Sequence, residues 1–212
     1  MFRALRTVVL LLSVLAVFGQ ANAADWKEGT HYKKLDTPVR TDSGSRVEVV
    51  EVFWYGCPHC YNFKPLAESW EAKAPDYVDY VRLPAALGRS WEPHARAFYA
   101  LEAINALDKL HDALFDALAG EHRPLNDGES LAEFVAGYGV DREEFLDSYN
   151  SFGVNARMQQ AQAKIRGARV TGTPTMLVNG KYTVSASMAG SLERVLEVVD
   201  YLVAREHDTA GE

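Results

Sequence analysis

The chain has 212 residues, with 29 acidic and 22 basic side chains and a formal net charge of −7 at neutral pH. An acidic surface argues against nucleic acid and anionic lipid as partners, because both are negatively charged. The length suits one domain, with or without an inserted subdomain, and it is enough to bury a hydrophobic core without disulfide cross-links.

The first 23 residues have the three parts of a secretory signal peptide. Arg3 and Arg6 give a basic start, residues 8–18 are apolar, and residues 21–23 form a small-residue cleavage pattern. A membrane anchor is the weaker alternative, because a bilayer crossing takes about 20 apolar residues. Cleavage after Ala23 would leave 189 residues, and the loss of two arginines would change the formal charge from −7 to −9.

Strand and helix signals alternate over the next part of the chain. A short edge strand is expected around Tyr32–Leu35. Residues 47–55 are β-branched and aromatic with little alternation, which predicts a strand buried on both faces. A helix is expected to begin at Pro58, because proline suits the first helical position, and to end before Pro75. Residues 77–83 predict another strand.

A long helical segment interrupts this alternation. From about residue 91 to residue 167 the pattern predicts several consecutive helices with no strand between them. Ser130 with Glu133, and Asp141 with Glu144, each have the spacing of a capping box, which predicts two helix starts.

Strand signals return near the C-terminus. Two short apolar runs are joined by Asn179-Gly180, a strong hairpin signal. A last helix is expected from about Ser191 to Glu206, followed by a frayed tail. Without the helical segment, a βαβ unit and a ββα unit remain around one sheet. The sequence therefore predicts an α/β protein with a thioredoxin fold, in which an inserted helical domain (89–167) separates two thioredoxin-like parts (24–88 and 168–212).

Cys57 and Cys60 are the only cysteines in the chain. Cys57 is expected at the N-terminus of a helix, where free N–H groups and the helix dipole favour an anion. This position lowers the pKa of a thiol from its usual value of about 8.5. His59 can add a positive charge or a hydrogen bond. Cys60, one turn inside the helix, is close enough to form a disulfide with Cys57 and is expected to be less exposed.

Two other uses of the cysteine pair are weaker. A tetrahedral zinc site needs four ligands, but the chain has no further cysteine and its other histidines show no ligand spacing. An inert structural disulfide would gain little stability by closing so short a loop. Thiol–disulfide redox chemistry is therefore favoured, and neither a metal nor another cofactor is expected.

Two stretches carry a resemblance to a known family. FWYGCPHCYNF, at residues 53–63, resembles the active site of DsbA-type thiol:disulfide oxidases, which are exported members of the thioredoxin superfamily. GTPTMLVNGKY, at residues 172–182, resembles their cis-proline loop and the hairpin that follows it. The resemblance implies that Cys57 attacks, that Cys60 resolves, and that Pro174 is the cis-proline beside the active-site disulfide.

Further site residues follow from this resemblance. Pro58 belongs to the Cys-Pro-His-Cys motif, and Thr173 stands where valine is expected in the best-known relatives, so that its hydroxyl can hydrogen-bond a sulfur. Glu51 lies six positions before Cys57, where thioredoxin-like proteins keep a buried acid. Burial raises a carboxyl pKa, so Glu51 could exchange protons with Cys60, unless it faces water at an edge. Arg82 could be its charge partner.

The function that the resemblance implies is that of a periplasmic protein-disulfide oxidase. It would act as a monomer, pass its disulfide to reduced, unfolded exported proteins, and be reoxidised by a membrane quinone oxidoreductase resembling DsbB. Two alternatives remain open. One is a disulfide reductase or isomerase on the same fold, and the other is a non-catalytic, chaperone-like binding module.

Overall fold

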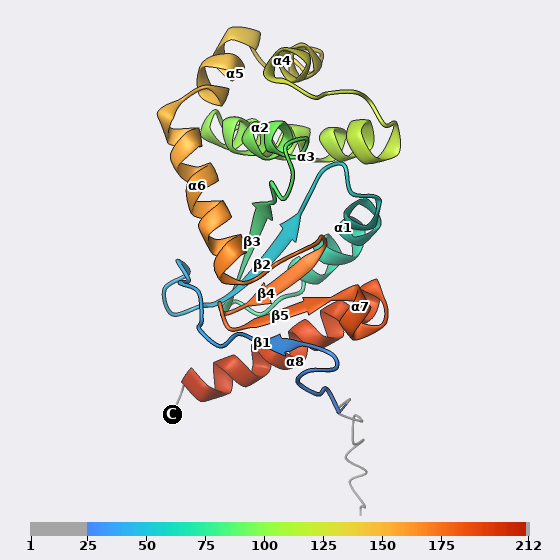
Figure 1. Ribbon diagram of the computed structural model, residues 1–212, viewed down its shortest axis with the longest axis vertical. Helices are drawn as coiled ribbons and strands as arrows, with labels where there is room; N and C mark the ends of the chain where they lie inside the picture. The colour runs from blue at the N-terminus through green and yellow to red at the C-terminus, as the bar shows by residue number, and fades with distance from the viewer. Residues whose placement is uncertain (1–24, 211–212) are drawn as a thin grey trace, which may run out of the picture.

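The computed structural model of the protein describes residues 25–210. Within them, a mixed five-stranded sheet has the strand order β1-β5-β4-β2-β3 (Figure 1). The strands are β1 (Lys33–Lys34), β2 (Val47–Phe53), β3 (Val78–Pro84), β4 (Thr175–Val178) and β5 (Tyr182–Ser185). The predicted βαβ and ββα units around one sheet are confirmed, and β1 is the predicted edge strand.

β2 is the strand that leads into the cysteine pair. It lies between β3, which runs parallel to it, and β4, which runs antiparallel. All seven of its residues are buried, which explains why its sequence is apolar without alternation. It ends at Phe53, two residues before the predicted end, because residues 54–56 turn the chain into the next helix.

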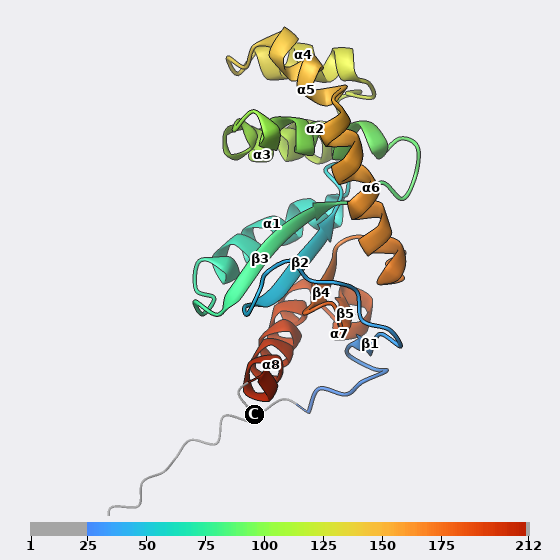
Figure 2. The same ribbon diagram turned by 90° about the vertical axis from the view of Figure 1, so that its left-hand side faces the viewer.

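Helices cover both faces of the sheet (Figure 2). α1 (Pro58–Glu71) and α8 (Leu192–Ala210) lie against one face, and α6 (Phe152–Gly167) lies against the other. The alternation of side chains along β2 places Val49 in the buried cluster of the first face and Val50 in that of the second. The C-terminal end of β2, which leads into the N-terminus of α1, therefore lies in the hydrophobic core.

Between β3 and β4 the chain forms several consecutive helices with no strand between them, as predicted. These helices stand at one end of the sheet, and α6 then returns along its face (Figure 1). They are α2 (Glu92–Ala103), α3 (Leu107–Phe115), the π-helical turn η1 (Asp116–Gly120), α4 (Gly128–Ala136) and α5 (Arg142–Tyr149), followed by α6. α6 packs both against the other inserted helices, α2 and α5, and against one face of the sheet. The division into domains at residues 89 and 167 therefore stays a prediction.

One predicted helix start is wrong and the other is confirmed. The N-cap of α4 is Asp127, whose side chain accepts a hydrogen bond from the Ser130 N–H at 2.8 Å, and the Ser130 hydroxyl completes the capping box. Ser130 is therefore the third residue of the helix, because an aspartate three positions earlier takes the N-cap position and accepts the Ser130 N–H. Asp141 does cap α5, since it accepts the Glu144 N–H at 2.8 Å.

The C-terminal part also differs from the prediction in one respect. The hairpin at Asn179-Gly180 is confirmed, with φ of 47° and 64° at its two residues. A short helix, α7 (Ala186–Ala189), joins β5 to α8. For residues 207–210 the predicted frayed tail is wrong, because α8 continues to Ala210 and the ring of His207 stacks on Tyr77 with centroids 3.7 Å apart; residues 211–212 lie outside the described residues.

The predicted signal peptide, residues 1–23, lies outside the described residues, and its cleavage stays a prediction. Among residues 25–210, no helix combines the length and the apolar character that a membrane crossing requires.

Candidate active site

The cysteine pair lies at the N-terminal end of α1. Cys57 is the N-cap residue, with an extended backbone, and its Sγ accepts a hydrogen bond from the backbone N–H of Cys60 at 3.4 Å. Pro58 takes the first helical position, where its missing N–H would have had no partner inside the helix. The predicted helix start is confirmed, and the Cys57 sulfur lies where the helix dipole favours an anion.

The two thiols differ in exposure and acidity. Cys57 is 7% exposed and Cys60 is 0% exposed, and both are free thiols. The Cys60 thiol donates a hydrogen bond that, with the Thr173 side chain and backbone N–H groups, lowers the pKa of Cys57 from 9.0 to about 5 against the effect of burial. Burial, together with the neighbouring Cys57 sulfur, raises the pKa of Cys60 far above its usual value. Cys57 is therefore the thiolate at neutral pH.

The loop before β4 lies against this sulfur. The peptide bond between Thr173 and Pro174 is cis, as the resemblance predicts. The carbonyl oxygen of Thr173 lies 3.5 Å from Sγ of Cys57. The Thr173 hydroxyl is buried and has no hydrogen-bond partner among the described residues, so it is free to turn toward a sulfur. Its side chain lowers the pKa of both Cys57 and Cys60.

A groove of about 800 Å³ lies along this loop and reaches His59, between the two cysteines in the sequence. Pro58 and His59 are both exposed, and His59 lines the groove. The groove is also lined by Thr173, Pro174, Ser187, Met188 and Leu192. Its lining mixes hydroxyl with apolar side chains. Within residues 25–210, no group of three or more His, Cys, Asp or Glu side chains is placed to hold a metal ion.

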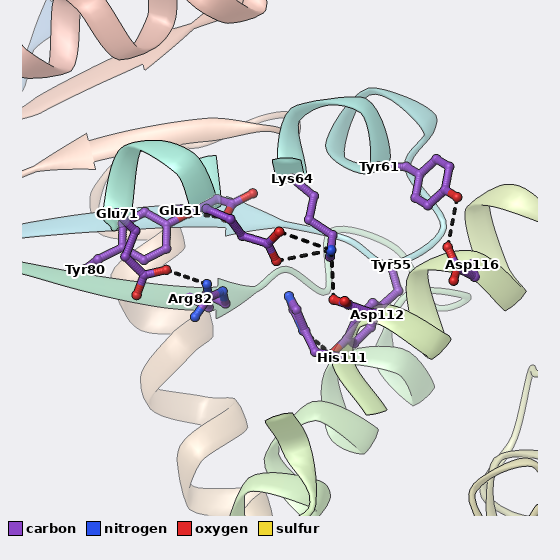
Figure 3. Close-up of polar contacts among 11 residues, drawn as sticks. Glu51, Tyr55, Tyr61, Lys64, Glu71, Tyr80, Arg82, His111, Asp112 and Asp116 are labelled. Carbon is purple, nitrogen blue, oxygen red and sulfur yellow. Dashed lines mark hydrogen bonds and ion pairs between the residues drawn. The ribbon is translucent and has the colours of Figure 1, made fainter. Parts of the chain in front are cut away.

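Glu51 lies in the middle of β2 and is 5% exposed. Because β2 has a strand on each side, the alternative of an edge position facing water is wrong. Tyr80 of β3 donates its hydroxyl hydrogen to the Glu51 carboxylate (Figure 3). Burial raises the pKa of Glu51 to about 7, although the Tyr80 hydrogen bond and the charge of Arg82 oppose this rise. Both protonation states of the carboxyl group are therefore present at neutral pH.

Arg82 does not form the predicted ion pair with Glu51, although the two residues are opposite each other in the β2–β3 register. Its Nη2 lies 2.6 Å from Oε2 of Glu71, in the last turn of α1 (Figure 3). The guanidinium also lies over the Tyr80 ring, 5.2 Å from its centroid. The prediction is wrong because a second carboxylate, on another element, binds the guanidinium.

Comparison with known proteins places the chain in a family. A family model described as a DSBA-like thioredoxin domain matches residues 77–197. The chain is 42% identical to the thiol:disulfide interchange protein DsbA of Pseudomonas aeruginosa, over 97% of this chain and 99% of that protein. It is 41% identical to the Azotobacter vinelandii protein of the same name, over 92% of each. The chain belongs to the DSBA-like thioredoxin family.

Solved structures of DsbA proteins have the same fold as this DsbA-family chain. The crystal structure of Pseudomonas aeruginosa DsbA matches it with a TM-score of 0.85, over 89% of this chain and 98% of that one. The DsbA of Xylella fastidiosa, 33% identical, matches with a TM-score of 0.80, over 86% of this chain and 98% of that one. The protein is thus a thiol:disulfide oxidoreductase with a thioredoxin-like fold. The family model matches only downstream of Cys60, so this match is independent of the cysteine motif.

Polar contacts that sequence patterns did not predict join α1 of this DsbA-family protein, and the turn before it, to α3 and η1 (Figure 3). They are Tyr55 Oη with His111 Nδ1 at 2.8 Å, Lys64 Nζ with Asp112 at 2.8 Å, and the Tyr61 hydroxyl with Asp116 at 2.8 Å. These contacts fix the helix that carries the thiols against the inserted helices. Each one joins residues nearly 50 or more positions apart, so no local pattern could have revealed it.

An aromatic stack flanks the turn before the cysteines. The rings of Trp54 and Trp91 lie parallel, with centroids 4.2 Å apart. The Trp54 indole N–H donates to Nδ1 of His94 at 2.9 Å, so Nε2 carries the hydrogen that is donated to the Leu125 carbonyl oxygen at 2.8 Å. Burial lowers the pKa of His94, which favours this neutral form. The stack ties the active-site turn to α2.

Proposed function

We propose that the protein is a periplasmic oxidase that passes a Cys57–Cys60 disulfide to reduced exported proteins. A substrate thiolate attacks Sγ of Cys57, the Cys57–Cys60 bond breaks, and Cys60 leaves and takes up a proton. A second substrate thiolate then attacks the substrate sulfur of the mixed disulfide, and Cys57 leaves as a thiolate. The substrate departs with a disulfide, and two electrons have moved to the enzyme's cysteine pair.

The low pKa of Cys57 is the observation that supports this direction. A sulfur that ionises easily is a good leaving group, and Cys57 has a pKa of about 5. A fold that stabilises this thiolate favours the reduced enzyme. The disulfide is therefore given up readily to substrate thiols, which ionise near pH ~8.5. A reductase would need a fold that favours the oxidised, disulfide form of the enzyme.

The residues around Cys57 have distinct proposed roles. The Thr173 carbonyl can accept an N–H from a substrate chain added as an extended strand, as in other edge-strand recognition. The Thr173 hydroxyl can donate to the sulfur anion. Pro58 and Pro174 lack N–H groups, so neither competes for backbone acceptors of the substrate. His59, when protonated, adds a positive charge that favours the Cys57 thiolate.

Glu51 is proposed to supply and remove the proton of Cys60. Cys60 must gain a proton as it leaves the disulfide and lose it again when the enzyme is reoxidised, because burial raises the pKa of this thiol far above neutral pH. A carboxyl group with a pKa of about 7 has both forms available at that pH, which two-way proton exchange requires.

Reduced, unfolded exported proteins are the proposed substrates, and the groove beside the thiols is the proposed contact surface. Each cycle leaves the enzyme reduced, so a second partner must take two electrons from it. We assign this step to a membrane quinone oxidoreductase resembling DsbB. The predicted signal peptide, with redox-active cysteines that need an oxidising compartment, supports a periplasmic location. The proposal is for a monomer that needs no cofactor and binds no nucleic acid.

Equilibration with reduced and oxidised glutathione tests the direction of the reaction. For an oxidase, we expect the cysteine pair to be mostly reduced even when most of the glutathione is oxidised. A pair that stays oxidised in mostly reduced glutathione would indicate a reductase or a structural disulfide. Cys57→Ser separates catalysis from chaperone activity. It should abolish oxidation of a reduced peptide, whereas a binding module would still suppress aggregation of an unfolded protein.

A further inference from the structure

Arg82 could pair with either of two carboxylates, and in the structure it is held by one of them. It lies opposite Glu51 in the β2–β3 register, but its guanidinium binds Glu71 at 2.6 Å (Figure 3). The side chains of Arg82 and Glu71 are 28% and 35% exposed, whereas Glu51 is 5% exposed. The cation therefore lies at the solvent boundary, and the buried acid is left with the Tyr80 hydroxyl as its hydrogen-bond donor.

We propose that Glu71 is a positioning residue for the thiol chemistry: by holding Arg82 at the solvent boundary, it keeps the guanidinium from pairing with Glu51, and so leaves Glu51 able to exchange a proton with Cys60. This inference rests on the role proposed above for Glu51. It assigns a function to the ion pair between Arg82 and Glu71, which contacts neither sulfur. Glu71 lies 14 residues after Cys57, at the other end of α1.

The groups that surround Glu51 support this assignment. Those that act on its charge are Tyr80 and Arg82 of β3, and Glu68 and Glu71 of α1. On the other side of β2, the register partner in β4 is the uncharged Met176. Glu68 is bound by Lys64, with 3.1 Å between the charged atoms, and this leaves Glu71 to hold the guanidinium. His111 and Asp112 of α3 lie on the far side of Arg82 (Figure 3).

Moving Arg82 from Glu71 to Glu51 would change the acid. An opposite charge within ion-pair distance lowers the pKa of a carboxyl group by about one to three units. Glu51 would then stay ionised at neutral pH and could no longer give a proton to Cys60. Without any guanidinium nearby, Glu51 would stay protonated over a wider pH range and would be a poorer acceptor. The Arg82–Glu71 ion pair at the solvent boundary keeps the pKa of Glu51 between these two extremes.

Glu71→Gln tests the proposal, because it keeps the shape of the side chain and removes the charge that holds Arg82. The measurement is the rate at which Cys60 displaces glutathione from a Cys57–glutathione mixed disulfide, followed by acid quenching over a range of pH. In the wild type, we expect this rate to have a midpoint near pH ~7, set by Glu51. In Glu71→Gln, the midpoint should fall by about one pH unit or more.

Glu68→Gln is the matched control. It removes a negative charge from the same helix without releasing Arg82, so its midpoint should fall by clearly less. In a double variant that combines Arg82→Met with Glu71→Gln, the pH midpoint should fall no further than in this control, because no guanidinium is left to move. Equal shifts in the two glutamine variants, or a large downward shift that persists in the double variant, would overturn the proposal.

Glu51→Gln distinguishes failure of this inference from failure of the proposed function. If the midpoint persists in Glu51→Gln, Glu51 is not the proton-exchanging group and the proposed role itself is wrong. If Glu51→Gln removes the midpoint but Glu71→Gln leaves it unmoved, Glu51 keeps its role and only the positioning role of Glu71 is wrong.

Discussion

The stability of the reduced protein is expected to depend on pH through Cys57. The pKa of this thiol is about 5 in the folded protein, against an ordinary value of 9.0, so folding stabilises the thiolate. A depressed pKa contributes stability that is complete above the unfolded value and is lost as the pH falls through the folded value. At pH ~7, about two pH units above the folded pKa, the contribution is about 3 kcal/mol. Typical domains have only about 5–15 kcal/mol in total.

Urea denaturation of the reduced and oxidised proteins between about pH 4 and about pH 8 measures this effect. The disulfide form has no thiolate, so the free energy of unfolding of the reduced form should rise with pH relative to that of the oxidised form. Reduced Cys57→Ser is the control, and its free energy of unfolding should not show this rise with pH. A difference between the two redox forms that stays constant over this range, or a Cys57 thiol that titrates near 9, would refute the thiolate argument and the oxidase direction with it.

Three substitutions around the site have defined outcomes. Thr173→Val should raise the pKa of Cys57 by about one unit, because it removes the hydroxyl that can donate to the charged sulfur; titration of the thiolate absorbance would show it, and an unchanged pKa would exclude the hydroxyl as a donor. His59→Ser should also raise this pKa, by less at high salt because the side chain is exposed, and a salt-independent change would point to packing. Gly56→Ala would place a Cβ against the Trp54 ring, closer than van der Waals contact allows, so unfolding in urea should show a loss of about 1–3 kcal/mol, and full stability would mean that the ring can move aside.

The chemistry of the cysteine pair could be predicted because its causes are local. A buried strand, a turn and a proline at the first helical position fix where Cys57 lies, and these features are written within about ten residues of sequence. The spacing of the two cysteines then places Cys60 one turn inside the helix. The hairpin at Asn179-Gly180 could be predicted for the same reason, because both of its residues accept positive φ.

The surroundings of Glu51 could not be predicted in the same way. Its burial could be inferred from its position in an apolar strand, but its partner depends on which side chains of β3 and α1 meet across the core. Arg82 lies opposite Glu51 in the strand register and pairs with Glu71 of α1, and the choice between the two carboxylates follows from solvent exposure and from the position of Lys64, which holds Glu68. Neither the solvent exposure of these side chains nor the position of Lys64 can be read from the spacing of residues in the sequence. The helix start at Asp127 was missed for a simpler reason, since two overlapping capping patterns share Ser130, and Asp127 accepts the Ser130 N–H that Glu133 would otherwise accept.

The difference between the two thiols also determines how protons balance in the proposed reaction. Near neutral pH, a substrate enters with two protonated thiols, because their pKa values lie near ~8.5. Its two protons are lost as its disulfide forms, but the reduced enzyme keeps only one, on Cys60, because Cys57 stays ionised with a pKa of about 5. Each turnover therefore releases one proton to solvent, so the equilibrium favours the oxidised substrate by about tenfold more for each pH unit between these two values. Below pH ~5 both enzyme thiols would be protonated, and this driving force would disappear.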